Sequence, residues 1–178
     1  KIKTVEFTST KAVKPYVKPV FDLINKTYTE IYGFTKLTED EMTEFAERFL
    51  PLLNPKLIKM ITDENGELLA FVIAMADLSE AIKNSRGRIL PFGWARILWA
   101  MKTSKRLQLL LGAIHPNYQN KGLDAVLATM LFGSALKLGF KTVDSHLIMK
   151  DNLKMRGEIE KLEGFNLYKE YCIFRKKL

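Results

Sequence analysis

The chain has 178 residues, 47% of them hydrophobic and 27% charged, which is the balance of an ordinary globular protein long enough to bury a core. Its net charge of +8 suits an anionic partner. Most lysines are scattered, however, and the two dense basic groups, at 102–106 and 175–177, are not interleaved with exposed aromatics, so nucleic acid is not the partner that we expect. Two histidines and one cysteine exclude an intrachain disulfide and argue against a bound metal.

The N-terminal part of the chain predicts a strand followed by two helices. Residues 2–7 alternate as a strand does. Pro19 suits the first turn of a helix whose apolar residues share one face, and Gly33 is expected to end that helix. Thr38 and Glu41 form a capping box for a second helix. The buried side of this second helix is expected to contain Met42, Phe45, Ala46, Phe49 and Leu50.

A β-hairpin follows the two helices. Residues 57–62 and 68–76 are two largely apolar runs of strand length. Asn65 and Gly66 stand between them, and this dipeptide is a strong signal for a tight turn because both of its residues tolerate positive φ. The two runs are therefore predicted to pair as antiparallel neighbours in a sheet.

Residues 78–104 are less regular and look like an insertion into the plain fold. Helical segments are expected at 78–84 and 92–101. The second segment admits four interpretations: part of the core, a wall of an acceptor pocket, an oligomer contact or a membrane-surface patch. A position in the core or in a contact surface is favoured, because a cluster of apolar residues of this size is rarely left exposed to solvent. The residues concerned are Phe92, Trp94, Ile97, Leu98, Trp99 and Met101, together with Arg96, Lys102, Lys105 and Arg106.

The most informative sequence is LLLGAIHPNYQNKGLDAVL at residues 109–127. Residues 109–114 predict a strand too continuously apolar to have a wet face, and Pro116 ends it. A polar loop at 117–122 opens a helix that Gly139 is expected to terminate. Such a loop presents unpaired backbone N–H groups at the positive end of the helix dipole, which is a site for a phosphate or diphosphate. The apolar residues at helical spacing are Leu123, Val126, Leu127, Met130, Leu131, Ala135 and Leu138.

The remaining chain predicts a strand at 142–148, a helix at 152–162 and a final strand at 168–174. With the earlier elements this makes a single α/β or α+β domain over all 178 residues. Cys172 is expected to be a small buried hydrophobe. We expect a cytoplasmic protein, because no signal peptide is recognisable and no run of about eighteen uncharged apolar residues predicts a transmembrane segment. Since the chain starts at Lys1, it could be the C-terminal domain of a longer protein.

The loop also carries a resemblance to a known family. Residues 115–123, HPNYQNKGL, resemble the signature of the GNAT acyltransferase superfamily, whose loop reads Gln/Arg-x-x-Gly-x-Gly/Ala. Gln119 and Gly122 match the first two marked positions, whereas the third is Asp124. The resemblance implies a mixed, mostly antiparallel sheet flanked by helices, with acetyl-CoA held by the backbone amides of the loop. The implied cofactor-binding residues are Ile114, Gln119, Asn120, Lys121, Gly122, Leu123, Asp124, Ala125 and Asn152.

Asp124 is the departure from the family pattern. As an acid in the first turn it favours its own helix, but a diphosphate at the same place would meet a like charge. At ~4 Å that repulsion is roughly 1 kcal/mol in water and about 4 kcal/mol at an effective dielectric of 20. A side chain turned into the groove would weaken CoA binding, and Lys121 next to it offsets part of its charge. The plainer alternative is that Gly122 serves only the turn and that Gln119 and Asn120 are caps or solvated polar groups.

The catalytic residues stay open. Many family members place a tyrosine, which protonates the departing thiolate, in the helix before a Gly-Phe pair, and here Ile159 is nearest to that position. Tyr168 and Tyr171 follow, but each is more typical of an ordinary strand aromatic. Asn152 starts the same helix, where the family often binds the pantetheine arm of CoA and where asparagine is equally a good N-cap. The nearest candidates for a general base are His115, Asp144 and His146.

The sequence therefore predicts an N-acyltransferase that moves an acetyl group from acetyl-CoA to a primary amine. The acceptor, a small molecule or a peptide, would be held by the two N-terminal helices and the segment 92–101, and transfer can proceed mainly by holding the reactants together. The alternative is a non-catalytic binding or regulatory module with a degenerate CoA site, favoured by Asp124 and the displaced tyrosine. A basic module for nucleic acid or anionic lipid is a weaker third hypothesis. No metal is expected, and a homodimer stays open.

Overall fold

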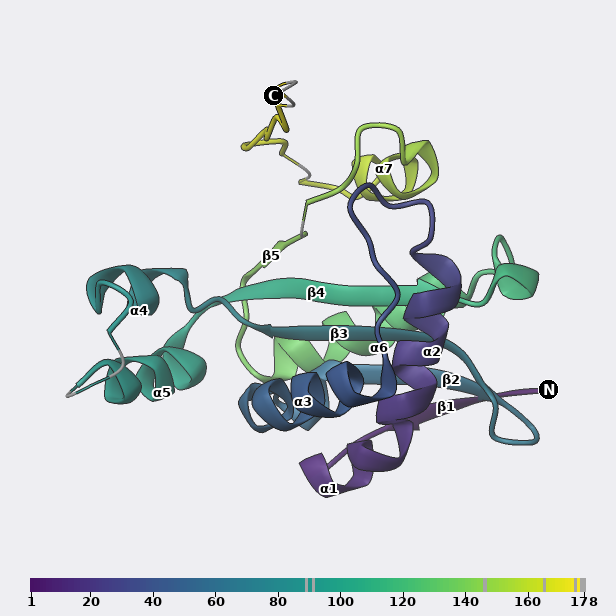
Figure 1. Ribbon diagram of the computed structural model, residues 1–178, viewed down its shortest axis with the longest axis horizontal. Helices are drawn as coiled ribbons and strands as arrows, with labels where there is room; N and C mark the ends of the chain where they lie inside the picture. The colour runs from purple at the N-terminus through teal and green to yellow at the C-terminus, as the bar shows by residue number, and fades with distance from the viewer. Residues whose placement is uncertain (89, 91, 146, 165, 175, 177–178) are drawn as a thin grey trace. The chain divides into compact units, whose positions relative to one another are not determined.

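The computed structural model describes the chain except residues 89, 91, 146, 165, 175, 177 and 178 (Figure 1). It consists of two compact units, Lys1–His146 and Leu147–Leu178. The first unit contains a five-stranded sheet with helices on both faces, and the second contains the helix α7 at Leu153–Glu160. No helix of the described residues is both long and apolar enough to cross a membrane.

The five strands lie in the sheet in the order of the sequence. They are β1 Ile2–Glu6, β2 Ile58–Asp63, β3 Leu68–Ala76, β4 Arg106–Ile114 and β5 Thr142–Asp144. Neighbouring strands are antiparallel except β4 and β5, which run parallel. The expectation of a mixed, mostly antiparallel sheet is therefore confirmed, as is the predicted hairpin, in which Gly66 turns the chain at φ 88°.

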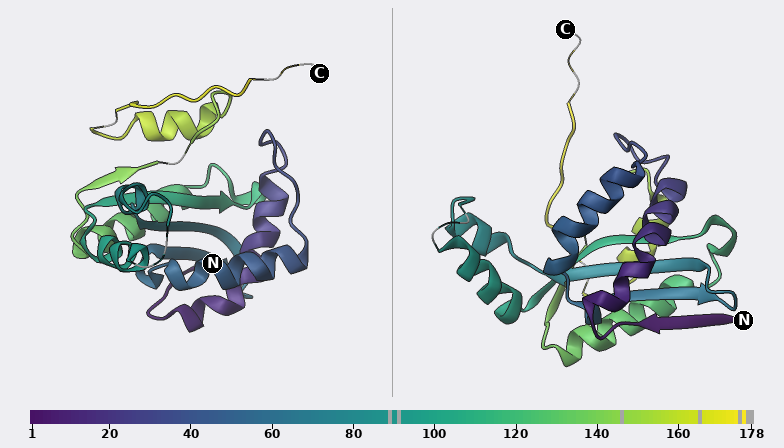
Figure 2. Two further views of the ribbon diagram at one scale, coloured as in Figure 1. Left: turned by 60° about the vertical axis from the view of Figure 1, so that its left-hand side comes forward. Right: turned by 60° about the horizontal axis from the view of Figure 1, so that its bottom comes forward.

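Helices bury both faces of the sheet (Figure 2). The helices of the first unit are α1 Thr10–Val13, α2 Val17–Thr27, α3 Glu39–Phe49, α4 Ser79–Asn84, α5 Gly93–Thr103 and α6 Leu123–Lys137. The alternation along β2 serves both faces: Ile58 and Met60 share a core cluster with residues of α2, whereas Ile61 packs with Leu127 of α6. Because both faces are dry, β2 and β3 read as nearly unbroken apolar runs in the sequence.

The N-terminal helices follow the sequence signals in part. α3 starts as predicted, because the Thr38 hydroxyl accepts from the Glu41 N–H and the Glu41 carboxylate accepts from the Thr38 N–H at 2.8 Å. α2, in contrast, ends at Thr27, before the expected end. The Asn25 side chain there binds both the N–H and the C=O of Leu37 at 2.9 Å, so a tertiary clamp folds the following loop back on the helix.

Two expectations of burial are only partly right. Met42 of α3 is buried, but Phe45 and Phe49 are 47% and 40% exposed. Their rings stack on each other, and Phe45 also contacts Phe21 edge-to-face, because α3 packs on α2 rather than on the sheet. β4, expected to have no wet face, is half-exposed over most of its middle.

α4 and α5 form a hairpin that joins the end of β3 to the start of β4 and extends beyond the sheet (Figure 1). Gly93 is required at the start of α5, because a Cβ there would lie 1.9 Å from the Arg88 carbonyl oxygen. The Arg96 guanidinium donates to the Asn84 carbonyl at 2.7 Å and ties the two helices together. Of the two positions favoured for this segment, the core is wrong, since the hairpin has little of the sheet to pack against, and a contact surface stays a prediction. The exposed fractions are 71% for Phe92, 51% for Trp94, 49% for Leu98 and 70% for Trp99.

The C-terminal elements are shorter than predicted. α6 ends as expected, with Gly139 at φ 85° just beyond it. The strand predicted at 142–148 is reduced to β5, and residues 168–174 form no strand in the described part of the chain. A strand needs a partner along its length, and the register between β4 and β5 ends at Asp144. Cys172 is exposed rather than buried, because the apolar run around it has no sheet to lie in.

Candidate functional site

The loop between β4 and α6 turns on two residues with positive φ. Pro116–Tyr118 forms a single 3-10 turn, after which Asn120 at φ 58° and Gly122 at φ 77° bring the chain into α6. Asparagine and glycine adopt this left-handed conformation at the lowest cost. A Cβ on Gly122 would meet open space, so no protein atom crowds the loop there.

A row of backbone donors lies at this turn. Within the described residues, no protein group accepts a hydrogen bond from the N–H groups of residues 120–125. α6 has no side-chain cap, so Gln119 and Asn120 do not serve as caps; the Gln119 carboxamide instead donates to the Ile114 carbonyl at 3.4 Å. Orphan donors at a helix start, together with the helix dipole, make an anion site. Binding of a diphosphate there stays a prediction.

Basic side chains flank the same loop. Lys26 Nζ lies 2.6 Å from His115 Nε2, and His115 Nδ1 accepts from the Asn117 N–H at 3.3 Å. Lys121 Nζ lies 4.9 Å from the centroid of the Tyr118 ring, in a cation–π contact. The contact through Nδ1 places the His115 ring at the start of the loop, next to Lys26, and a role for His115 as a general base stays a prediction.

Asp124 occupies the second position of α6 and is exposed. Its carboxylate does not cap the helix, and it is not buried in the fold. The backbone N–H groups around it are therefore not blocked by a bond to this side chain. Its charge acts on the site through water, where screening is strong.

Next to the loop, the described residues of the first unit provide no strand partner for the edge of β4 that faces β5. The register between β4 and β5 ends at Gln108 and Asp144, yet β4 continues to Ile114. Within that stretch the Tyr28 hydroxyl donates to the Gly112 carbonyl at 3.0 Å and accepts from the Gly112 N–H at 3.4 Å. One side chain thus engages both main-chain groups of a residue on the free edge, in the place that a neighbouring strand would fill.

Tyr28 is a site residue that sequence reasoning missed. It is half-buried and packs edge-to-face on Phe34, with ring centroids 5.8 Å apart. Burial raises the pKa of Tyr28 above its ordinary value of 10.0, while the hydrogen bond to Gly112 opposes the rise, so the hydroxyl keeps its proton at neutral pH. In the sequence Tyr28 is one more member of an apolar helix face. Its partner lies 84 positions away, and no local signal connects the two.

The other catalytic candidates belong to different units of the chain. Asp144 ends β5, and His146 lies outside the described residues. Ile159 belongs to α7 in the second unit. Tyr168 and Tyr171 of that unit are 53% and 65% exposed. A catalytic role for any of these residues therefore stays a prediction.

Asn152 is the N-cap of α7. Its side-chain oxygen accepts a hydrogen bond from the Met155 N–H at 3.1 Å, so the capping interpretation is confirmed. Contact with a pantetheine arm stays a prediction. Among the described residues, no group of three histidine, cysteine, aspartate or glutamate side chains could hold a metal ion.

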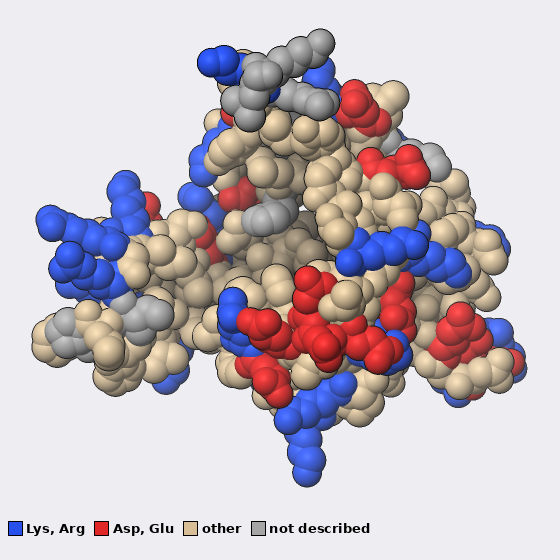
Figure 3. Space-filling model, viewed as in Figure 1, with Lys and Arg blue, Asp and Glu red and all other residues tan. Residues whose placement is uncertain are grey.

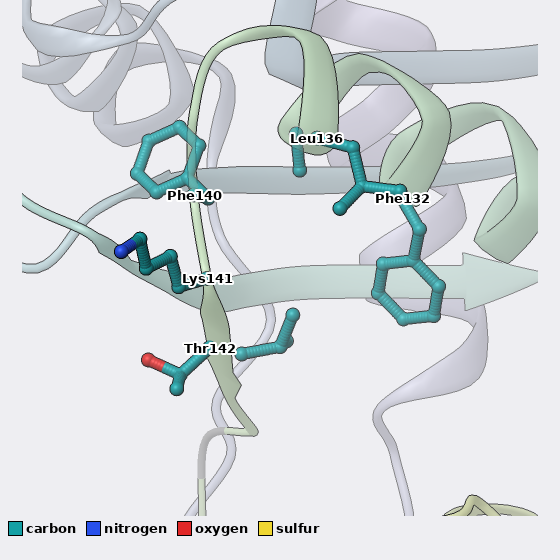
Figure 4. Close-up of a pocket in the computed structure, with 7 residues that line it drawn as sticks. Phe132, Leu136, Phe140, Lys141 and Thr142 are labelled. Carbon is teal, nitrogen blue, oxygen red and sulfur yellow. The ribbon is translucent and has the colours of Figure 1, made fainter.

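A hollow of about 170 Å³ lies elsewhere, between the C-terminal end of α6 and β5 (Figure 4). Phe132 and Leu136 of α6, with Phe140 and Val143, give it a mainly apolar lining. Phe132 is nine residues after Leu123 in α6, so this hollow is separated from the donor row by roughly 14 Å of helix or more. It cannot be the site of an anion held by the first turn.

Known proteins resemble this chain along most of its length. No protein-family model matches it. Bacterial ceramide synthase from Caulobacter vibrioides is 25% identical over 168 residues, which cover 91% of this chain and 43% of that protein. Protein YghO from Escherichia coli is 26% identical over 164 residues, covering 88% of this chain and 41% of its own length. The chain thus spans about two fifths of the length of the curated relatives it matches.

Solved structures match at lower identity. AAC(6')-Iy, in complex with the bisubstrate analogue CoA-S-monomethyl-acetylneamine, is 13% identical with a TM-score of 0.58, and the match covers 100% of this chain and 98% of that one. The ribosomal-protein-S18-alanine N-acetyltransferase from Escherichia coli is 15% identical with a TM-score of 0.52, covering 88% and 73%. An N-acetyltransferase from Staphylococcus aureus Mu50 is 13% identical with a TM-score of 0.57, covering 90% and 81%. These matches show that the chain has the fold of these acetyltransferases, which is the fold that the resemblance to the GNAT superfamily implied.

Proposed function

We propose that this protein is an acyl-CoA-dependent N-acyltransferase that acylates a primary amine. The observation that carries the proposal is the row of unpartnered N–H groups at residues 120–125, beside the free edge of β4. The N–H groups would hold the diphosphate of CoA, with Lys26 and Lys121 as nearby cations. When bound, the cofactor supplies a thioester, an acyl group already activated toward amines.

The free edge of β4 suits the pantetheine arm. That arm contains amides, and the Gly112 N–H and C=O groups offer the pairing that a neighbouring strand would provide. Tyr28 holds both groups in this structure, so we propose that its hydroxyl is released when the arm pairs with the edge. A protonated tyrosine at this place is also our candidate donor for the departing thiolate, in the role that Ile159 cannot fill.

The comparisons bear on the acyl chain and on the acceptor. Two of the solved neighbours are named as N-acetyltransferases, and a third is in complex with a CoA-linked bisubstrate analogue; both observations support acetyl-CoA as a donor. The relative from Caulobacter vibrioides is named as a ceramide synthase, and a ceramide is an amide of a long-chain amino alcohol. We therefore propose that the acceptor is an amine with a lipid chain and that longer acyl-CoA donors are used beside acetyl-CoA. The use of CoA and the single cysteine support a cytoplasmic location.

The second candidate, a GNAT-fold module without catalysis, is favoured by one specific observation. The position nearest to the family's tyrosine is Ile159, which has no proton to give. This candidate and the first differ in a direct measurement: the release of free CoA in the presence of an amine.

The experiment that tests the proposal uses Ala125→Pro. Proline at the third position of a helix removes one backbone N–H, and α2 already carries Pro19 at its third position, so the substitution fits a first turn. Loss of one hydrogen bond to a charged group costs about 1.5–3 kcal/mol, which is about 10- to 100-fold in affinity for CoA. Ala125→Ser keeps the N–H and is the matched control.

Calorimetric titration with CoA and thiol detection of CoA released from acetyl-CoA or palmitoyl-CoA with a primary amine give the two readouts. We expect binding by the wild-type protein and by Ala125→Ser, with weaker binding by Ala125→Pro. Equal affinities of all three proteins for CoA would show that the N–H groups of the donor row do not hold the diphosphate. Binding without release of CoA from any donor would favour the non-catalytic module.

A further inference from the structure

The α4–α5 hairpin presents large apolar side chains to solvent from both helices and from their connection. The most exposed are Ile82 at 50%, Leu90 at 75%, Phe92 at 71%, Leu98 at 49% and Trp99 at 70%. We propose that this hairpin docks on an anionic lipid membrane, with these side chains entering the interface between headgroups and acyl chains. The name "docking hairpin" is used below for residues 79–106.

The charge of the docking hairpin complements such a surface. Residues 79–106 contain seven lysines and arginines and one acid, Glu80, a net charge of +6 out of +8 for the whole chain. Lys83, Arg86, Arg88 and Lys102 are exposed around the apolar side chains. Figure 3 shows this concentration of basic residues at the α4–α5 end, whereas acidic residues gather over α3. Aromatic and apolar groups among basic ones are the composition of interfacial helices.

The same charge argues against other occupants. In a symmetric dimer built on this patch, each copy would place its own +6 against that of the partner, which is repulsive. Nucleic acid would use the basic residues and stack on Phe92 and Trp99. It would, however, leave Ile82, Leu90 and Leu98, which are exposed and aliphatic, in water. A bilayer accommodates both the aliphatic side chains and the cations.

The placement of the docking hairpin suits a lipid substrate, a step that rests on the proposed function. The hairpin connects Ala76 of β3 to Arg106 of β4, whereas the donor row follows Ile114 at the other end of β4. The nine residues of β4 separate the two by roughly 30 Å. A protein docked through the hairpin would hold its CoA loop in water while the free edge of β4 lies between the loop and the membrane. An amine anchored in the bilayer could then approach from one end and the acyl donor from the other.

Vesicle sedimentation tests the docking. The protein is mixed with vesicles of phosphatidylcholine alone or with about 30% phosphatidylglycerol, and the bound fraction is measured at low and high salt. We expect binding only to the anionic vesicles and weakening by salt. Phe92→Ser with Trp99→Ser, and separately Lys83→Glu with Lys102→Glu, should each lower the partition coefficient about tenfold or more.

Matched controls change the same chemistry elsewhere. Tyr32→Ser with Leu136→Ser removes side chains that are 64% and 72% exposed, and Lys11→Glu with Lys14→Glu makes the same change of charge outside the docking hairpin. Both should bind like the wild-type protein, and circular dichroism confirms that every variant is folded.

Several outcomes would overturn the docking. They are wild-type protein that stays in the supernatant with anionic vesicles, controls that lose as much binding as the hairpin variants, a dimer that the Phe92→Ser/Trp99→Ser variant dissociates, or a single-stranded RNA that outcompetes vesicles. Failure of the proposed function looks different, because vesicle binding would persist while CoA binding and CoA release are absent. If CoA is released in the presence of a water-soluble amine but the protein does not bind vesicles, the proposed acyltransferase function is supported and the proposed membrane docking is refuted.

Discussion

Replacing Asp124 by asparagine removes one negative charge beside the donor row and keeps the size of the side chain. The carboxylate is exposed, so its repulsion of a bound diphosphate acts through water. At about 4–5 Å and a dielectric near 80 the repulsion is about 1 kcal/mol, which corresponds to roughly fivefold tighter binding of CoA by Asp124→Asn. At an effective dielectric of 20 the repulsion would reach about 4 kcal/mol, a value that we reserve for a buried carboxylate.

Asp40→Asn is the matched control, because Asp40 occupies the second position of α3 as Asp124 does in α6. Each substitution removes a favourable charge from a helix start and should lower the free energy of unfolding by about 0.3–1 kcal/mol. Only Asp124→Asn should change the affinity for CoA, measured by calorimetric titration. The gain should shrink as salt is raised from about 0.02 M to about 1 M, because the Debye length falls to about 3 Å. Equal affinities of wild-type protein and Asp124→Asn at low salt would refute this electrostatic account of the loop.

Three further predictions concern stability. Burial raises the pKa of Tyr28 in the folded state, so the folded protein favours the protonated phenol. This stabilisation should be complete below about pH 10 and be lost as the pH rises beyond it. In urea unfolding above about pH 10, the free energy of unfolding of Tyr28→Phe should therefore fall less steeply with pH than that of the wild type. Lys59 is 1% exposed, and its ammonium group contacts Glu6 and, at 2.7 Å, the Ser134 hydroxyl. Lys59→Ala should lower the free energy of unfolding by about 2–5 kcal/mol. Lys59→Met keeps most of the buried aliphatic side chain and should lower it by less than about 1.5 kcal/mol. Thr38→Ala should lower the free energy of unfolding by about 1 kcal/mol through loss of the capping box, and an unchanged melting temperature would contradict that role.

Local signals predicted the fold where their physical causes are local. The capping box at Thr38, the Asn65-Gly66 turn and Gly139 beyond α6 each involve neighbours in sequence, and each stands where it was expected. The end of α2 could not be predicted in the same way, because Asn25 stops the helix through Leu37, outside its own turn.

Burial was less predictable than secondary structure. The spacing of apolar residues in α3 and in residues 92–101 indicates helices correctly, but the number of apolar residues does not reveal what lies opposite them. In α3 the facing element is α2, and only Met42 reaches the interior. Around Trp99 the hairpin leaves the sheet behind, so a helix that looks like a core element is exposed.

In the candidate site, too, the features with local causes could be predicted from the sequence and those with distant causes could not. The donor row follows from a glycine loop that opens a helix, which is visible in the residues themselves. Tyr28 reaches the candidate site only when the chain folds, since its hydroxyl binds Gly112 of β4, 84 positions along the sequence. A resemblance to a family supplies positions from its own motif, and Tyr28 lies outside that motif.

The hydrogen bonds between Tyr28 and Gly112 also bear on how the protein avoids sticking to itself. A strand whose main-chain groups face outward invites pairing with the corresponding strand of another molecule, and β4 continues past the last paired residue of β5. The Tyr28 hydroxyl engages both main-chain groups of Gly112, so a strand from a second molecule could not form its hydrogen bonds with β4 at this residue. Tyr28 would thus protect the protein from edge-to-edge aggregation while no ligand is paired with this edge of β4.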